Sequence, residues 1–396
     1  MIKPSTLLKS ERLGVVDALR GFALMAIVLL HNLEHYNIYH LPEGQPSWLD
    51  SLDKGVWDTV FFLFAGKAFA TFSLLFGFSF FIQMDNQARK GYDFRLRFAW
   101  RLLLLALFAQ LHALFYNGDI LLLYAFCGFF LIPVARLSNK LVLAIATVLV
   151  CQPFEWYRMI RALMDPAYVT SVGSQFMEYA NRCWGPTTEG SFLETLASNI
   201  GDGQLFSNYW QVENGRLFLV PGLFMFGMLL ERLRYFVKSD GSIRFWKRLL
   251  PASFIVFLVL TALKILLVDW VGLQSDSFKI AYGVAIGSYV NFAMMCILVS
   301  LFVLFWFRVE EGYRIQRFLI PYGRMSLTNY IFQSIIGCSI YYGYGLELWR
   351  SSGATGSLLI GIGIFLFQRL YSRYWLSHFR QGPLEYLWKR LTWLGK

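Results

Sequence analysis

The first apolar segment of the chain carries three side chains that could take part in chemistry. They are Asp17, Arg20 and His31, in the stretch VVDALRGFALMAIVLLHN. Eleven residues separate Arg20 from His31, almost three whole helical turns, so the two share one face about 16 Å apart along the axis. An arginine fork can bind phosphate, and a histidine can act as general base for a hydroxyl or amine. The spacing predicts a site with two chemically distinct ends.

The same residues also fit a structural interpretation. Asp17 and Arg20 are one turn apart and can form an ion pair within the helix. Arg20 would then extend toward lipid headgroups, and His31 would only face water at the opposite end. Spacing alone leaves both interpretations open.

Two further positions are candidates for the same site. Lys67 lies about ten residues into an apolar stretch, roughly 15 Å deep, so we expect it to face a polar cavity or a partner such as Asp17 or Asp119. Arg324 begins another apolar stretch, where it can bind phosphate or act as a positively charged anchor at the membrane surface.

A histidine and an aspartate flank a short polar turn between two apolar stretches. His112 and Asp119 are close enough in sequence to form a general base and the carboxylate that orients it. Asn117, in the turn itself, could help to orient a substrate. The alternative is a hydrogen-bonded cap of the helical hairpin.

The composition indicates that these residues lie in a membrane protein. Hydrophobic residues make up 57% of the 396 residues and charged residues only 15%, whereas soluble domains have about a quarter charged. The net charge of +11 could suggest nucleic-acid binding, but basic residues between apolar stretches are typical of cytoplasmic loops. The five cysteines show no spacing typical of a metal site, so we expect no metal.

We expect an all-α helical bundle with about ten membrane spans, in a single transmembrane domain over residues 1–396. The spans are placed at 14–32, 57–83, 99–116, 119–134, 141–157, 217–235, 249–270, 280–307, 325–347 and 357–375. A cytoplasmic N-terminus puts 26 of the 36 Lys and Arg residues on the cytoplasmic side and seven outside. This bias predicts that both termini are cytoplasmic.

One long segment, 158–216, lies outside in this topology. It is polar, with too few consecutive apolar residues for another crossing, and we expect interfacial helices or a lid. Gly283 and Gly287 form a weak GxxxG pattern, which fits ordinary helix packing and leaves a homodimer open.

Several segments resemble one family of bacterial membrane proteins, the YeiB-like family. They are VVDALRGFALMAIVLLHN, GKAFATFSLLFGFSF at 66–80, NGDILLLYAFCGFFLIP at 117–133, YGRMSLTNYIFQSIIG at 322–337 and HFRQGPLEYLWKRLT at 378–392. They follow the family's order and cover nearly the whole chain.

The YeiB-like family is similar to the lysosomal heparan-alpha-glucosaminide acetyltransferase and to acyltransferase-three membrane enzymes. This resemblance implies transfer of an acyl group, such as acetyl, from cytoplasmic acyl-CoA to an external glycan or other small acceptor. His31 would be the base, since acyltransferase-three enzymes space an Arg and an essential His as Arg20 and His31 are spaced. Most YeiB-like relatives carry Asn at this position.

The heparan enzyme has its working histidine in the first external loop, which makes His35 and His40 alternatives. Arg20, with Lys67 and Arg324, would hold the acyl-CoA. The predicted location is the bacterial inner membrane. A transporter or flippase for an anionic solute or lipid, without covalent chemistry, is the rival hypothesis.

Overall fold

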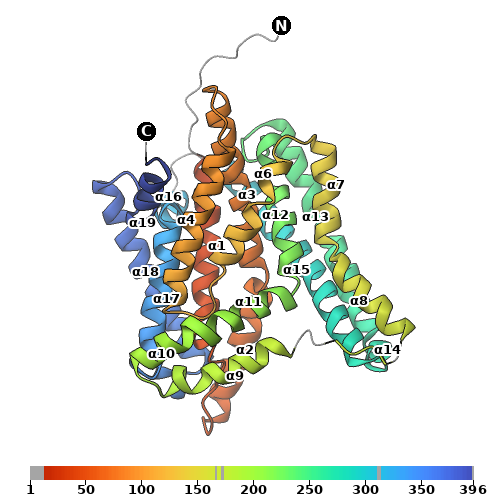
Figure 1. Ribbon diagram of the computed structural model, residues 1–396, viewed down its shortest axis with the longest axis vertical. Helices are drawn as coiled ribbons and strands as arrows, with labels where there is room; N and C mark the ends of the chain where they lie inside the picture. The colour runs from red at the N-terminus through yellow and green to blue at the C-terminus, as the bar shows by residue number, and fades with distance from the viewer. Residues whose placement is uncertain (1–12, 166, 171–173, 310–313, 395–396) are drawn as a thin grey trace.

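The computed structural model describes residues 13–165, 167–170, 174–309 and 314–394, which form an all-helical bundle without strands in these ranges (Figure 1). The longer helices are α1 (Gly14–Leu33), α2 (Ser47–Phe64), α3 (Lys67–Ala88), α4 (Arg95–Ala113), α7 (Asn139–Val150), α8 (Pro153–Met164), α9 (Gln175–Thr188), α11 (Gln204–Glu213), α12 (Arg216–Arg232), α13 (Asp240–Leu266), α15 (Asp276–Arg308), α16 (Arg314–Arg324), α17 (Ser326–Tyr341), α18 (Ala354–His378) and α19 (Pro383–Thr392). The shorter ones are α5 (Leu121–Gly128), α6 (Leu131–Val134), α10 (Phe192–Ser198) and α14 (Val268–Gly272).

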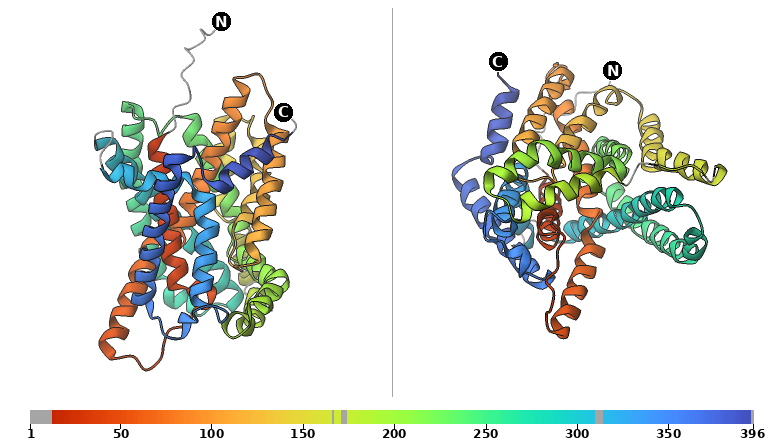
Figure 2. Two further views of the ribbon diagram at one scale, coloured as in Figure 1. Left: turned by 90° about the vertical axis from the view of Figure 1, so that its left-hand side faces the viewer. Right: turned by 60° about the horizontal axis from the view of Figure 1, so that its bottom comes forward.

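Helix α1 is the centre of the bundle. Its sequence is apolar on nearly every side, and 15 of its 20 residues are buried against neighbours that include α3, α16 and α18. Helix α19 lies at the end of the bundle where α1 begins, and α9, α10 and α11 lie across the end where α1 finishes (Figures 1 and 2). The two ends of the bundle therefore carry different elements.

Six stretches of the described residues are long and apolar enough to cross a membrane: Gly14–Leu33, Ser47–Ala88, Arg95–Ala113, Asp240–Leu266, Asp276–Arg308 and Ala354–His378. The helices α7 and α8, bent by 43° at their junction, add a seventh if they count as one span. Each of the ten predicted intervals contains helix, but α12 with 17 residues, α17 with 16 and the pair α5 and α6 are shorter than the predicted spans. The structure thus identifies a helical membrane protein.

The predicted span 57–83 lies within the membrane-length stretch Ser47–Ala88, but its helix is interrupted at Gly66. This residue has φ +78°, a left-handed conformation that favours glycine, and an added Cβ would lie 2.3 Å from Nδ2 of Asn291. The break ends α2 and makes Lys67 the first residue of α3.

The segment 158–216 folds into helices in its described residues. It contains the end of α8, then α9, α10, the π-helical turn Asn199–Gly203 and α11. Ser207 Oγ donates to the Asp119 carbonyl at 3.0 Å, and Asn199 Nδ2 donates to the Leu114 carbonyl at 3.0 Å. The turn between α4 and α5 is therefore covered by this segment.

A strained turn follows α1. Four residues with side chains have positive φ: His35 (+46°), Tyr36 (+52°), Asn37 (+81°) and Tyr39 (+52°). Each such conformation costs about 1 kcal/mol or more and persists only where the surroundings fix it. The hydroxyl of Tyr342 donates to the Tyr36 carbonyl at 2.9 Å and helps to fix the turn.

The close crossing of α3 and α12 depends on two glycines. A Cβ at Gly77 would lie 1.8 Å from the Phe224 carbonyl oxygen, and one at Gly227 would lie 1.7 Å from the Leu74 carbonyl oxygen. The backbones therefore touch at this crossing, and any side chain would separate the helices.

We predict that Gly77→Ala destabilises the protein by about 1–3 kcal/mol, because the added methyl group overpacks the α3–α12 crossing. Gly287→Ala is the matched control, since a Cβ there meets nothing within 4 Å. Thermal unfolding of the detergent-purified protein measures both. Equal melting temperatures for the two variants would contradict this account of the crossing.

A second prediction concerns acid stability through His35. Its Nε2 lies 2.8 Å from Ser357 Oγ, and burial, together with the nearby His40, lowers the pKa of His35 to about 4. The unfolded chain takes up this proton near pH 6.5, so stability falls as pH drops from 6.5 toward 4. At pH 5 the loss is about 2 kcal/mol relative to pH 7.

His35→Asn, which tolerates positive φ, should remove this part of the pH dependence. His378→Asn, at the exposed end of α18, should leave it unchanged. Thermal unfolding at pH 7 and pH 5 gives the comparison; an undiminished loss in His35→Asn would assign the pH effect to other groups.

Candidate functional site

A cavity of about 790 Å³ runs from the α19 end of the bundle toward its middle. Residues of α1, α3, α4, α5, α17 and α19 line it. Lys389, an exposed residue of α19, lines one end, so the cavity opens there. Ile27, Tyr124 and Tyr330 line its inner end.

The open end of the cavity is rich in cations. Arg20, Arg101, Arg324 and Lys389 line it. The Arg101 guanidinium stacks over Trp388, 3.5 Å from the ring centroid, which ties α4 to α19. This end is suited to a ligand that carries negative charge.

The two carboxylates of the cavity wall are both engaged. Asp17 Oδ1 accepts from Arg20 Nη1 at 2.9 Å. Glu385 accepts from the backbone N–H groups of Leu327 and Thr328, at 2.7 and 3.1 Å, and so caps α17. Carboxylates with such partners neutralise little of the positive charge of the other lining residues.

The surroundings of Arg20 contain features of both interpretations, the ion pair within the helix and a position in a candidate site. It pairs with Asp17 inside the helix, its Nη2 donates to Ser79 Oγ at 2.8 Å, and it lines the cavity. It points to neighbouring helices of the bundle, whereas the alternative interpretation had it extending to headgroups. Arg324 also lines the cavity and donates to the Arg380 carbonyl at 2.8 Å.

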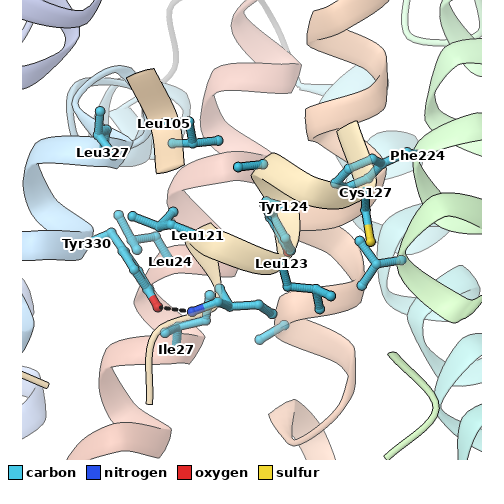
Figure 3. Close-up of a cluster of buried hydrophobic side chains, with 14 of the residues drawn as sticks. Leu24, Ile27, Leu105, Leu121, Leu123, Tyr124, Cys127, Phe224, Leu327 and Tyr330 are labelled. Atoms are coloured by element: carbon cyan, nitrogen blue, oxygen red, sulfur yellow. Dashed lines mark hydrogen bonds between the residues drawn. The ribbon is translucent and has the colours of Figure 1, made fainter. Parts of the chain in front are cut away.

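The inner end of the cavity is closed by aromatic residues. Tyr330 reaches from α17 to the start of α5, where its hydroxyl accepts from the Ile120 N–H at 3.4 Å (Figure 3). The hydroxyl of Tyr124 donates to the Phe69 carbonyl at 3.0 Å. These rings form the wall between the cavity and the polar cluster described next.

Directly behind Tyr330 lies a buried histidine and its carboxylate. The rings of His112 and Tyr330 are 5.2 Å apart. His112 Nδ1 lies 2.7 Å from Asp119 Oδ1, while Asp119 Oδ2 accepts from the Leu122 N–H at 3.1 Å. The aspartate is thus both the helix cap and the partner of the histidine that the sequence suggested.

The pairing assigns the tautomer of His112. With a carboxylate at Nδ1, that nitrogen carries the proton, which leaves a lone pair on Nε2. Nε2 is buried and has no hydrogen-bond partner among the described residues. An oriented imidazole with a free lone pair can accept a proton from an acceptor hydroxyl or amine.

His31 lies on the other side of Tyr116 from His112. Ring centroids are 5.2 Å apart between His31 and Tyr116, and 5.9 Å apart between His112 and Tyr116. On α1, His31 is one turn beyond Ile27, the last cavity-lining residue of that helix. Arg20 and His31 share one face as the spacing predicts, but the cavity ends one turn before His31.

Sequence reasoning missed two ionisable residues of this cluster. Arg216, the half-buried first residue of α12, has its guanidinium carbon 4.0 Å from the ring centroids of both Phe69 and Trp210. Burial raises the pKa of Glu34 to about 7, although its bond to Tyr39 and the charge of Arg216 oppose this. Both residues lie at the ends of apolar stretches, where the sequence indicates only loop charges.

Lys67 is not part of this cluster or of the cavity wall. It is buried, 5.8 Å from the ring centroid of Phe62, and it forms no ion pair or side-chain hydrogen bond with the described residues. The expected partners are occupied, Asp17 by Arg20 and Asp119 by His112. The prediction of a partner for Lys67 is wrong for this part of the chain.

The remaining candidates contact other groups. Asn117 Oδ1 accepts from Asn37 Nδ2 at 2.9 Å, beneath the α9–α11 layer. His35 is fully buried and stacks on Tyr341, and His40 packs edge-on against Trp349. The three histidines of HNLEHYNIYH therefore have separate surroundings.

Comparison with known proteins identifies relatives along the whole chain. Residues 230–395 match the family described as protein of unknown function (DUF418). The chain is 27% identical to the uncharacterized protein YxaH of Bacillus subtilis, over 98% of this chain and 96% of that protein. It is 26% identical to the uncharacterized protein YeiB of Escherichia coli, over 96% of each.

No solved structure matches the chain. The DUF418 region contains two of the five quoted segments, at 322–337 and 378–392. These matches confirm the resemblance to the YeiB-like family.

Proposed function

We propose that the protein is a membrane-embedded acyltransferase. It would take an acyl group, such as acetyl, from cytoplasmic acyl-CoA and deliver it to a hydroxyl or amine of an external acceptor, such as a glycan. The observation that carries this proposal is the position of the His112–Asp119 pair, directly behind the inner end of a cation-rich cavity.

The cavity has the chemistry that the donor requires. Cations at its open end, among them Arg20, Arg101 and Arg324, would bind the phosphates. Apolar and aromatic residues such as Phe72, Phe76 and Leu105 would line the path of the acyl arm. The thioester would then reach the inner end, near Tyr330.

The reaction can be written with residues of this site. His112 Nε2 takes the proton from the acceptor as its oxygen or nitrogen attacks the thioester carbon. The carbon–sulfur bond then breaks, and the CoA thiolate leaves with a proton returned by the imidazolium. Asp119 stabilises that imidazolium and keeps Nε2 aimed at the acceptor. His31, across Tyr116, is the alternative base.

The proposed topology has ten spans and both termini in the cytoplasm of a bacterial cell, with the protein in the inner membrane. Two observations support it. The Lys and Arg residues are distributed 26 to seven in its favour, and α19 and the start of α1 lie at the same end of the bundle (Figure 2). The cavity would then open to the cytoplasm.

A transporter of an anionic solute or lipid is the second candidate. The break between α2 and α3 at Gly66 favours it, because broken helices are common at transporter binding sites. Such a protein would bind its anion without covalent chemistry, and acyl-CoA would not be consumed.

We predict that His112→Ala lowers acyl transfer about 10²–10⁴-fold, the usual contribution of a general base. Asp119→Asn should lower it less, since the imidazole remains but loses its anionic partner. The measurements are thiol release from acetyl-CoA with a panel of sugars and amines, and calorimetric binding of acetyl-CoA, on purified variants. Acetyl-CoA affinity should stay unchanged, because His112 is not in the cavity wall.

His378→Ala is the matched control, because the exposed side chain of His378 at the end of α18 does not line the cavity, and it should keep full activity. His31→Asn tests the alternative base. Loss of transfer in His31→Asn with retention in His112→Ala would move the base to α1. If the unmodified protein does not bind acetyl-CoA, the transporter is favoured.

The topology gives a separate prediction. Reporter fusions after residues 50 and 200 should read external, and a fusion at the C-terminus should read cytoplasmic, because the basic residues retain their loops inside. A cytoplasmic signal after residue 200 would place α9–α11 inside and reverse the proposed direction of transfer.

A further inference from the structure

The guanidinium of Arg216 is held in a fixed plane. Phe69 and Trp210 lie on it, each with its ring centroid 4.0 Å from the guanidinium carbon. One edge of the fork is occupied, since Nη1 donates to Gln211 Oε1 at 2.9 Å. This is the only hydrogen bond of the Arg216 side chain with the described residues, so other N–H donors remain for a ligand.

No carboxylate of the described residues forms an ion pair with Arg216. Other arginines in the same half of the bundle differ in this respect. Arg182 pairs with Glu178 and Asp202, and Arg350 pairs with Glu347 and Glu189, although both are more exposed. A half-buried cation without a counter-ion is costly unless an anion or water completes its surroundings.

Glu34 and Asp119 do not supply that counter-ion. The charge of Arg216 opposes the rise that burial causes in the pKa of Glu34, so the two groups interact electrostatically. They do not form an ion pair within 4.0 Å. Asp119 is committed to His112. The charge of Arg216 is therefore available.

The location of Arg216 also favours binding of an anion. As the first residue of α12, it lies beside the free N–H groups of that helix, which also favour an anion. Phe69, one of its two stacking rings, lines the inner end of the cavity, while Trp210 and Gln211 belong to α11 in the α9–α11 layer. Arg216 thus lies between the donor cavity and the opposite end of the bundle.

We propose that Arg216 binds an anionic group, a carboxylate or a phosphate, of the ligand that enters from the α9–α11 end. The proposed acceptor is therefore an acidic molecule and not a neutral sugar. The identification of this ligand as the acceptor rests on the proposed function. The anion site itself does not depend on that function. A planar carboxylate or a phosphate can take two parallel N–H bonds from the open edge of the fork.

The test compares pairs of probes that differ by one charge. Calorimetry on the purified full chain measures binding of D-glucuronate against D-glucose, and of glycerol 3-phosphate against glycerol. At least one acid should bind tenfold or more tightly than its neutral partner. Which of the two binds distinguishes a carboxylate from a phosphate ligand.

Arg216→Gln should weaken this binding at least tenfold, and Arg216→Lys should retain part of it, because the charge remains without the fork. Arg182→Gln is the matched control and should bind normally. Equal binding of acid and neutral probes, or full binding by a folded Arg216→Gln, would overturn the proposal.

The two proposals can fail separately. Anion binding at Arg216 without acetyl-CoA binding would refute the acyltransferase and keep the anion site. Acetyl-CoA turnover with neutral acceptors, unaffected by Arg216→Gln, would keep the acyltransferase and refute the anion site.

Discussion

The cost of an ionised side chain in an apolar bundle governs the arrangement of this protein. Each such group must find a partner or water, because an unpaired charge in a low-dielectric interior costs several kcal/mol. Asp17 with Arg20, Glu155 with Arg158, and His112 with Asp119 meet this requirement inside the bundle. The cavity meets it for the cations of the open end, which line a space that opens beside Lys389.

Charge pairs within one helix or across one turn could be predicted from sequence, because their geometry depends only on local spacing. Arg20 lies three residues from Asp17, and Asp119 lies seven from His112, so few arrangements are available. The surroundings of Arg216 could not be predicted in this way. Phe69 is 147 residues away in the chain, and only the crossing of α3 with α12 brings its ring to the guanidinium.

The fold likewise has features that local sequence predicts and features that depend on long-range contacts. Each of the ten intervals that hydropathy indicated contains helix, since length and apolar content determine whether a segment can cross a bilayer. It did not indicate where helices break. The break at Gly66 depends on the close approach of Asn291, and the start of α17 depends on Glu385, 58 residues later. Such long-range contacts leave no periodic signal in a sequence.

The wall between the two polar regions bears on the choice between transfer and transport. Tyr124, Tyr330 and Phe69 separate the cation-rich cavity from the cluster of His31, His112 and Arg216. A solute that crosses the whole protein would have to displace these rings, which are held by hydrogen bonds such as Tyr124 to the Phe69 carbonyl. Acyl transfer needs to move only the acyl group past the rings, which for acetyl is two carbon atoms and one oxygen. The wall of aromatic rings therefore obstructs group transfer less than it obstructs transport of a whole solute.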